Sequence, residues 1–174
     1  MSQGLRMSTL IPTERTQIRR IPKRGSYERE VMNAILDEAL VCHVGFNHRD
    51  MPFVIPTTFA RIGERIFVHG AAASRMLGAI LDHPLCVTVT LVDGLVLARS
   101  AFHHSMNYRS VVLMGRGRDV TLREGKLEAL AAFIEKTSPN RSTEVRAPND
   151  KELAATRVIT LDLTEASAKI RTGG

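Results

Sequence analysis

The feature that most constrains the fold is a series of short β-rich runs that follow one another through polar turns. The runs 41–46, 53–62 and 65–70 are separated by the polar residues 47–50 and by Gly63-Glu64. Apolar β-rich runs bounded by such clusters are typical of strands joined by turns. Successive strands that are joined directly pair in the antiparallel sense, so these runs predict an antiparallel meander.

Two further segments extend this pattern through the middle of the chain. Residues 85–102 form two β-rich runs about Asp93-Gly94, a dipeptide typical of two-residue hairpin turns, and so predict a hairpin there. Residues 109–120 predict another long strand, in which the glycines of 115–117 favour a β-bulge. A last strand is expected over 157–163.

Helices are expected around these strands. Apolar residues recur at helical spacing in 27–40, in 71–83 and in 127–134, and Asn149 with Glu152 has the spacing of a capping box for one more short helix. Strands and helices do not alternate as a parallel α/β sheet requires. The predicted fold class is therefore mainly β with peripheral helices, an antiparallel β-barrel with the helices packed on it.

Composition and charge limit the classes of protein that the chain can belong to. Its 174 residues, 44% of them hydrophobic, suit one domain. The two cysteines, Cys42 and Cys86, lie in apolar strands and form no CxxC motif, which excludes a zinc ribbon and a thioredoxin-like site. No apolar run approaches the length of about 18–20 residues that spans a bilayer. A reduced, cytoplasmic protein without a membrane segment is expected.

The basic character of the chain resides in its N-terminal arm. Of the net charge of +6, residues 1–24 supply six basic side chains against one acid, so that the domain predicted over 25–174 carries only +1. Nucleic-acid-binding domains instead gather basic residues on a folded face with aromatic residues between them, and aromatic residues are only 5% here. The arm is interpreted as a solvated tail or as a segment packed on a neighbouring subunit, while binding to an acidic partner stays open.

The segment 68–76 is the most informative for function. It leads from a strand into a helix through Gly70 and three alanines, and it places Ser74 and Arg75 at the helix N-terminus. Free N–H groups, a hydroxyl and a guanidinium in one place favour a phosphate. The alternative is that the alanines only begin a helix and that Arg75 is solvated.

The polar segment 103–110 is a second candidate binding region between strand-like flanks. The alternative is a plain loop with hydrogen-bonded histidines. No Asp, Glu or Cys lies nearby to complete a metal site around His103 and His104, so no metal is predicted. The chain lacks the GxSxG, HExxH, Walker and GxGxxG motifs.

Taken in order, these motifs resemble the pyridoxamine 5′-phosphate oxidase-like FMN-binding split-barrel family, in its branch of flavin-nucleotide-binding and nitroimidazole-resistance proteins. The segments that carry the resemblance are RGSYERE (24–30), ILDEALVCHVGF (35–46), PFVIPTTFA (52–60), VHGAAASRM (68–76), VTVTLVDGLVLARSAFHHSMNYRSVVLMGR (87–116) and EASAKIRTG (165–173). The resemblance implies a split β-barrel homodimer that binds FMN in grooves between its protomers.

The resemblance also implies which residues bind the cofactor. The backbone of 54–57 would lie along the isoalloxazine ring, with 69–70 at the next strand end, 74–75 on the phosphate, and 108–110 completing the cleft from the same or the other protomer. The full set of implied cofactor-binding residues is Val54, Ile55, Pro56, Thr57, His69, Gly70, Ser74, Arg75, Met76, Asn107, Tyr108, Arg109 and Ser110.

Two departures from the family oxidases bear on the reaction. Met76 stands where they carry a phosphate-binding lysine, and the chain has no tryptophan to close the oxidase substrate site. Oxidation of pyridoxamine phosphate is therefore not carried over. The main hypothesis is a flavin-dependent oxidoreductase that acts on a small molecule, with nitro-group reduction implied by the nitroimidazole-resistance branch and His69 as a candidate catalytic proton donor.

Two alternatives stay open. One is a non-catalytic binding or sensing protein that holds FMN, haem or a deazaflavin. The other is a regulator that uses its basic arm on nucleic acid, whose binding would weaken steeply with salt.

Overall fold

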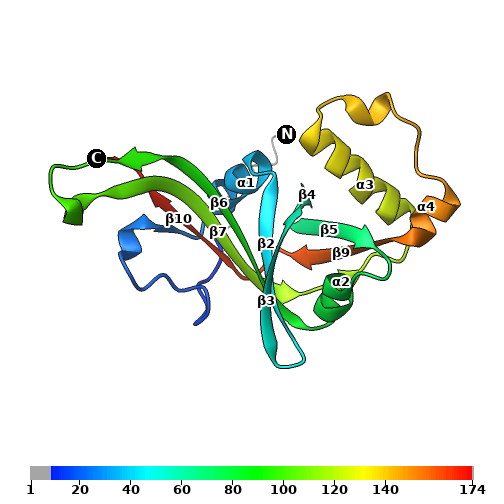
Figure 1. Cartoon of the computed structure of the whole chain (residues 1–174), viewed down its shortest axis with the longest axis horizontal. Coiled ribbons are helices and arrows are strands. Elements are labelled where there is room, and N and C mark those ends of the chain that lie inside the picture. Colours follow the sequence, from blue (N-terminus) through cyan, green and yellow to red (C-terminus); the bar gives the residue numbers. More distant parts are fainter. Residues whose placement is uncertain (1–8, 174) are drawn as a thin grey trace, which may run out of the picture.

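The computed structural model describes residues 9–173, and within them the strands form two antiparallel sheets (Figure 1). The larger sheet has the order β1-β10-β7-β6-β2-β3 and the smaller one β4-β5-β9-β8. The strands are β1 (Gly25–Ser26), β2 (Val41–His48), β3 (Met51–Thr58), β4 (Ala60–Ile62), β5 (Arg65–Ala71), β6 (Pro84–Val96), β7 (Ser105–Arg116), β8 (Arg118–Asp119), β9 (Thr156–Asp162) and β10 (Ala166–Arg171). The predicted fold class, mainly antiparallel β with peripheral helices, is confirmed.

Four α-helices within the described residues surround the sheets: α1 (Arg29–Glu38), α2 (Arg75–Ile80), α3 (Arg123–Thr137) and α4 (Asp150–Ala155). Figure 1 shows α3 and α4 beside the smaller sheet and the β6–β7 ribbon extending away to the opposite side. None of the helices between residues 9 and 173 is long and apolar enough to cross a membrane.

The core lies where the two sheets and α1 meet. Helix α1 buries Met32, Ile35 and Leu36, as its helical spacing predicts. They join buried side chains of both sheets, among them Val44, Phe59, Ile66, Val87, Leu113 and Leu161. A second, smaller cluster under α3 contains Ala60, Phe67, Ala129, Phe133 and Val158. Burial of these side chains is the main term that holds the helices on the sheets.

The hairpin turn predicted at Asp93-Gly94 is wrong. Strand β6 continues to Val96 and contains a bulge between Val92 and Gly94, and the connection to β7 follows over 97–104. Neither Asp93 nor Gly94 has the positive φ that a type I′ turn requires. The Asp93 carboxylate instead accepts a hydrogen bond from Arg109 of β7 (Oδ1 to Nη2, 2.7 Å). Pairing with β7 therefore overrides the local turn preference.

The long strand predicted over 109–120 is confirmed as far as Arg116, but its central bulge is wrong. Strand β7 already begins at Ser105, so much of the polar segment 103–110 is strand rather than loop. The chain leaves the larger sheet after Arg116 and enters the smaller one at Arg118, so Gly117 lies where the chain passes between sheets. Strand β10 is an addition that the residue patterns did not predict.

Helix α2 is shorter than predicted. It ends at Ile80, because Asp82 adopts a left-handed φ of 57° and its N–H donates to the Gly117 carbonyl (2.8 Å). This long-range hydrogen bond takes the chain out of the helix before Pro84 could end it.

The part of the N-terminal arm that the structure describes, residues 9–24, packs on its own chain. The Leu10 N–H donates to the Tyr27 carbonyl (2.8 Å), the Ile18 N–H donates to the Tyr27 hydroxyl (2.9 Å), and Arg15 forms an ion pair with Glu165. These contacts contradict a solvated tail over residues 9–24. Residues 1–8 lie outside the described residues, and the domain boundary at residue 24 stays a prediction.

The predicted capping box at α4 is confirmed. The Asn149 side chain accepts from the Glu152 N–H (2.9 Å), and the Glu152 carboxylate accepts from the Asn149 N–H (2.9 Å). Replacing Asn149 with alanine should lower the free energy of unfolding by about 1 kcal/mol, because it leaves a helix N–H without its partner. Urea denaturation would measure this, with the exposed Lys151→Ala as control; equal midpoints for the two variants would contradict it.

Candidate functional site

The corner between β5 and α2 is built around Arg75. Ser74 is the N-cap of α2, and its hydroxyl accepts from the Leu77 N–H (3.4 Å). The Arg75 guanidinium lies over the Phe53 ring of β3, 5.0 Å from its centre, and Phe53 stacks on Phe46 (5.6 Å). Among residues 9–173 no carboxylate forms an ion pair with Arg75. An exposed guanidinium that is oriented but not neutralised is suited to bind an anion.

The neighbours of Arg75 contribute unequally. Gly70 faces α2, since a Cβ there would lie 3.3 Å from Leu77. The Ala72 N–H donates to the Ala155 carbonyl (2.8 Å), so the end of α4 supports the loop before α2. Met76 packs against the main core. Met76, which stands where the family oxidases carry a lysine, therefore contributes to packing in this chain. Arg75 supplies the positive charge at the corner.

Residues 54–57 lie on an edge strand. Strand β3 pairs with β2, and in the described part of the chain no strand pairs along its other edge. Val54 and Pro56 are exposed, while Ile55 and Thr57 are partly buried. The outer edge of such a strand offers backbone N–H and C=O groups, which can hydrogen-bond the polar atoms of a planar ring. Pro56 lacks an N–H and can only accept.

His69 lies on the other face of the smaller sheet from α2. Its ring packs edge-on against Phe133 of α3 (4.2 Å between ring centres), whereas the adjacent Gly70 faces Leu77. Its Nδ1 is buried and has no hydrogen-bond partner among the described residues. Burial lowers the pKa of His69, which favours the neutral imidazole. Within one chain the structure thus separates this candidate proton donor from Arg75.

Residues 107–110 lie on β7, in the part that Figure 1 shows extending away from α2. The Arg109 guanidinium donates to Glu38 (2.8 Å) and to Asp93 (2.7 Å). Hydrogen bonding to Glu38 and Asp93 raises the pKa of Arg109, and hydrogen bonding from Arg109 lowers the pKa of both carboxyl groups. Arg109 thereby ties the end of α1 to the bulge of β6.

Asn107 and Ser110, which lie near Arg109 on β7, also have hydrogen-bond partners on the same chain. The Asn107 amide oxygen accepts from Arg171 (2.7 Å), and the Ser110 hydroxyl donates to the Lys169 carbonyl (3.3 Å). Tyr108 is half-buried. Within a single protomer this segment is not brought next to Arg75, so a cleft that contains both needs a second protomer.

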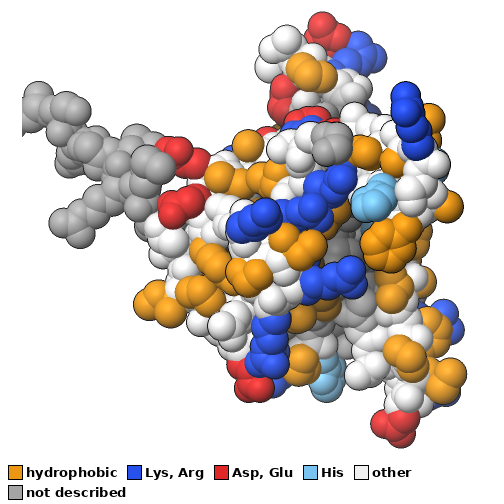
Figure 2. Space-filling view, turned by 90° about the vertical axis from the view of Figure 1, so that its left-hand side faces the viewer, with side chains coloured by type: hydrophobic (Ala, Val, Ile, Leu, Met, Phe, Trp, Pro, Cys, Tyr) orange, Lys and Arg blue, Asp and Glu red, His pale blue; other side chains and the backbone are white. Residues whose placement is uncertain are grey.

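The register places Tyr108 and the edge strand on one face of the larger sheet. Pro56 lies opposite His43, which lies opposite Thr88 and then Val112. Side chains two residues apart share a face, so Val54 and Tyr108 belong to the same face. Exposed hydrophobic side chains on this face are Val54 (65%), Val92 (62%) and Leu95 (73%), and Leu97 (78%) and Phe102 (90%) are exposed in the connection that follows β6. Figure 2, which looks onto the left-hand side of Figure 1, shows hydrophobic side chains exposed between Lys and Arg.

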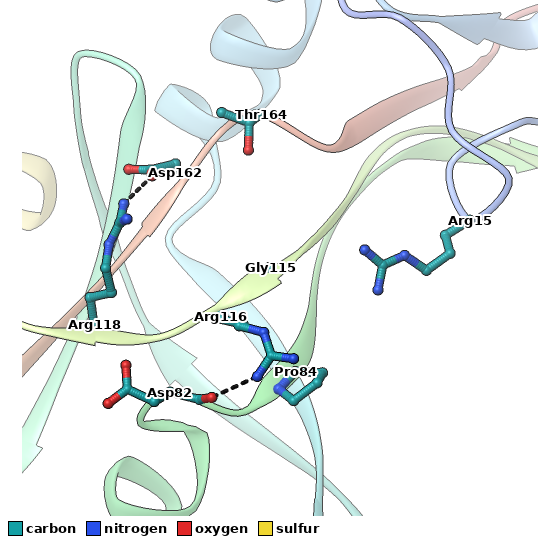
Figure 3. A pocket seen from close by; sticks show the side chains of 8 residues that line it. All are labelled: Arg15, Asp82, Pro84, Gly115, Arg116, Arg118, Asp162 and Thr164. Atoms are coloured by element: carbon teal, nitrogen blue, oxygen red, sulfur yellow. Dashed lines mark hydrogen bonds and ion pairs between the residues drawn. The ribbon is translucent and has the colours of Figure 1, made fainter.

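A cleft of about 440 Å³ that is lined by arginines lies where β7 passes into β8 (Figure 3). The residue patterns did not predict this cleft. Arg118 pairs with Asp162, Arg116 donates to the Asp82 carbonyl (2.7 Å), and Arg15 reaches the cleft from the N-terminal arm. The Gly115–Arg118 repeat was the only sequence signal for it, and that repeat was interpreted as a bulge.

The environment of the two cysteines disfavours the thiolate. Burial raises the pKa of Cys42 to about 12 and also raises the pKa of Cys86. In the described residues no three His, Cys, Asp or Glu side chains are grouped so that they could hold a metal ion.

Two antiparallel sheets with an open edge strand and an arginine at the β5–α2 corner define a protein of the split-barrel class. Residues 28–170 match the family model described as pyridoxamine 5′-phosphate oxidase. The chain belongs to the pyridoxamine 5′-phosphate oxidase family, and its fold is the split barrel of that family. No curated protein matches the chain.

Solved structures give closer comparisons. The flavocytochrome Anf3 from Azotobacter vinelandii is 40% identical, with a TM-score of 0.88, and the match covers 94% of this chain and 77% of that one. An FAD- and haem-binding protein from Mycobacterium smegmatis is 33% identical, with a TM-score of 0.82 and coverage of 86% and 74%. A putative 5-nitroimidazole antibiotic resistance protein from Bacteroides thetaiotaomicron is 19% identical, with a TM-score of 0.69 and coverage of 84% and 86%. The last likeness bears on the fold alone.

Proposed function

We propose that the protein is a flavin- and haem-binding protein of the flavocytochrome type that holds FAD. The observation that carries this proposal is the 40% identity over 94% of the chain to a flavocytochrome, joined by 33% identity to a protein named for FAD and haem. FAD takes the place of the FMN that the sequence resemblance implied. The proposal thus favours the cofactor-holding alternative over a free nitro-group reductase.

The residues around Arg75 fit a flavin. The unneutralised guanidinium suits a phosphate, and the open edge of 54–57 suits the polar rim of the ring. A bound flavin supplies hydride or electron transfer, while this chain contributes binding and orientation. Flavin-dependent turnover of a small molecule stays a prediction, because the relative named for nitroimidazole resistance is only 19% identical.

His104 fits the role of a haem ligand. Its Nδ1 lies 3.1 Å from the Ser100 carbonyl oxygen, which can only accept, so Nδ1 is the donor and Nε2 is the nitrogen that a metal could bind. Histidines that bind metals commonly donate their other N–H to a carbonyl in this way. The exposed Leu97 and Phe102 nearby in the sequence offer the apolar contacts that a porphyrin needs.

We further propose a homodimer with the cofactors at the protomer interface. The exposed apolar face that contains Val54 and Val92 is suited to pack against its copy. A second protomer would also bring Tyr108 toward the Arg75 corner. Sedimentation equilibrium should give twice the chain mass of 19.3 kDa; a monomer at micromolar concentration would contradict the dimer.

The function is tested on the freshly purified full chain. The visible spectrum should contain flavin bands and a Soret band, and mass spectrometry of the denatured extract should find FAD and haem. His104→Ala should lose most of the Soret absorbance and keep its flavin, whereas His103→Ala, whose ring packs on Phe102 (5.4 Å), should keep both. A wild-type chain that takes up neither cofactor would refute the proposed function, and a His104→Ala variant with full haem would refute the ligand.

A further inference from the structure

We propose that the cleft between the β2–β3 turn and α2 binds the adenylate half of the flavin dinucleotide and gives the protein its preference for FAD over FMN. This inference rests on the proposed function, since it concerns the flavin bound at Arg75. The residues that line the cleft are Asn47, His48, Arg49, Arg75, Gly78, Ala79 and His83.

The cleft has the size and openness for half a dinucleotide. Its volume is about 520 Å³, within the range of small-molecule sites. Gly78 leaves its α2 side free of side chain, and a Cβ built there has nothing within 4 Å. A flat base therefore has room to lie along this side of the helix.

The side chains that line the cleft favour an anionic ligand. Its lining residues include two arginines and two histidines but no Asp or Glu. Between residues 9 and 173 neither Arg49 nor Arg75 forms an ion pair with a carboxylate. Guanidiniums that are not neutralised on their own chain keep their donors for a phosphate.

The cleft shown in Figure 3 also contains arginines, but unlike Arg49 and Arg75 these have partners on their own chain. Asp82 and Asp162 line it, Arg118 is paired with Asp162, and Arg116 is bonded to a backbone carbonyl. Arg15 is paired with Glu165. Because these guanidiniums already have partners, the cleft beside α2 is the better site for a second phosphate.

Two side chains of the cleft and the backbone of its turn are held in place before a ligand arrives. The Phe53 ring carries Arg75 on its face (5.0 Å) and His48 at its edge (6.3 Å between ring centres). Arg49 and Asp50 both have positive φ, 51° and 60°, which is the backbone of a two-residue hairpin turn. Arg49 thus projects from a tight turn, and little conformational freedom of the backbone is lost on binding.

Arg75 links the cleft to the flavin corner because it belongs to both. FMN carries one phosphate, which Arg75 can bind by itself. FAD carries two phosphates and an adenosine, so its second phosphate needs further donors, and Arg49 and His83 lie in the cleft to supply them. Their removal should therefore weaken FAD and leave FMN almost unaffected.

The test compares both flavins on the full chain freed of cofactor, with binding followed by flavin fluorescence. Arg49→Gln and His83→Gln should each raise the Kd for FAD by about 10-fold, as expected for one lost charge-assisted hydrogen bond, and change the Kd for FMN by less than about twofold. Arg65→Gln is the control for Arg49→Gln, since Arg65 is also an exposed arginine but lies outside the cleft. AMP, which is the adenylate half alone, should compete with FAD and not with FMN.

The outcomes separate this inference from the function on which it rests. Equal weakening of FAD and FMN in the Arg49 and His83 variants, or no weakening of either, would overturn the cleft assignment while flavin binding stands. A wild-type chain that binds neither flavin would overturn both. Binding of AMP by a wild-type chain that does not bind FAD would identify a site for free nucleotide and would also overturn the inference.

Discussion

Replacing Arg75 with alanine is expected to weaken FAD binding by about 10- to 100-fold while the flavin-free protein keeps its stability. The side chain is exposed and forms no ion pair with the described residues, so the fold loses only its stacking on Phe53 (5.0 Å). Such exposed cation–π contacts contribute about 0.5–1 kcal/mol. A lost charge-assisted hydrogen bond to a phosphate costs about 1.5–3 kcal/mol of binding free energy.

Fluorescence titration with FAD and thermal denaturation of the flavin-free chain would measure the two effects. Arg65→Ala is the control, because it removes the same kind of side chain from the same kind of stacking contact, on Phe67 (5.5 Å). If Arg75→Ala bound FAD as tightly as the Arg65 variant, the phosphate would have to be held elsewhere and the site would be wrong.

Replacing Gly117 with valine is expected to lower the free energy of unfolding by about 3 kcal/mol, the upper end of the cost of overpacking. A Cβ at this position would lie 2.6 Å from the Ile80 carbonyl oxygen and 2.8 Å from the Ile159 side chain. The backbone at the end of α2 cannot easily retreat, because the Asp82 N–H is bonded to the Gly117 carbonyl (2.8 Å). Strand and helix would have to separate.

The matched control for Gly117 is Gly78, which lies within α2 and where an added Cβ would have nothing within 4 Å. Gly78→Ala should raise the free energy of unfolding by about 0.5–1 kcal/mol through its better helix propensity. Urea denaturation of the flavin-free chain would compare the two variants with the wild type. If the Gly117→Val variant had the same midpoint as the wild type, the structure around Gly117 would have room for a side chain and the prediction would be wrong.

Local sequence patterns predicted much of the fold, because each pattern reflects an interaction between residues that are close along the chain. Apolar spacing in α1 predicted which face is buried, and the capping box at Asn149 satisfies helix N–H groups within four residues. The same holds for the strand-to-helix corner that ends at Arg75. Each of these features depends on residues that are neighbours along the chain.

The errors arose where distant residues decide. Asp93-Gly94 has the chemistry of a turn, yet its pairing with β7 and the ion pair with Arg109 keep it in a strand. The glycines of 115–117 were assigned to a bulge, whereas Gly117 is required by the approach of α2. Neither the sheet that receives β8 nor the length of α2 could be derived from local preference.

The sequence by itself determined most of the antiparallel strands, the face that α1 buries and the cap of α4, since hydrophobic periodicity and capping act over a few residues. The buried residues of α3, Ala129 and Phe133, were not those of the predicted stripe, and the phosphate-binding corner stays a prediction. Only the tertiary structure decided which cations are free. Arg109, Arg118 and Arg15 look equivalent to Arg75 in a sequence, but acidic side chains up to 150 residues away neutralise them. The availability of a charge for a ligand depends on its neighbours in space, and those neighbours exist only once the sheets have formed.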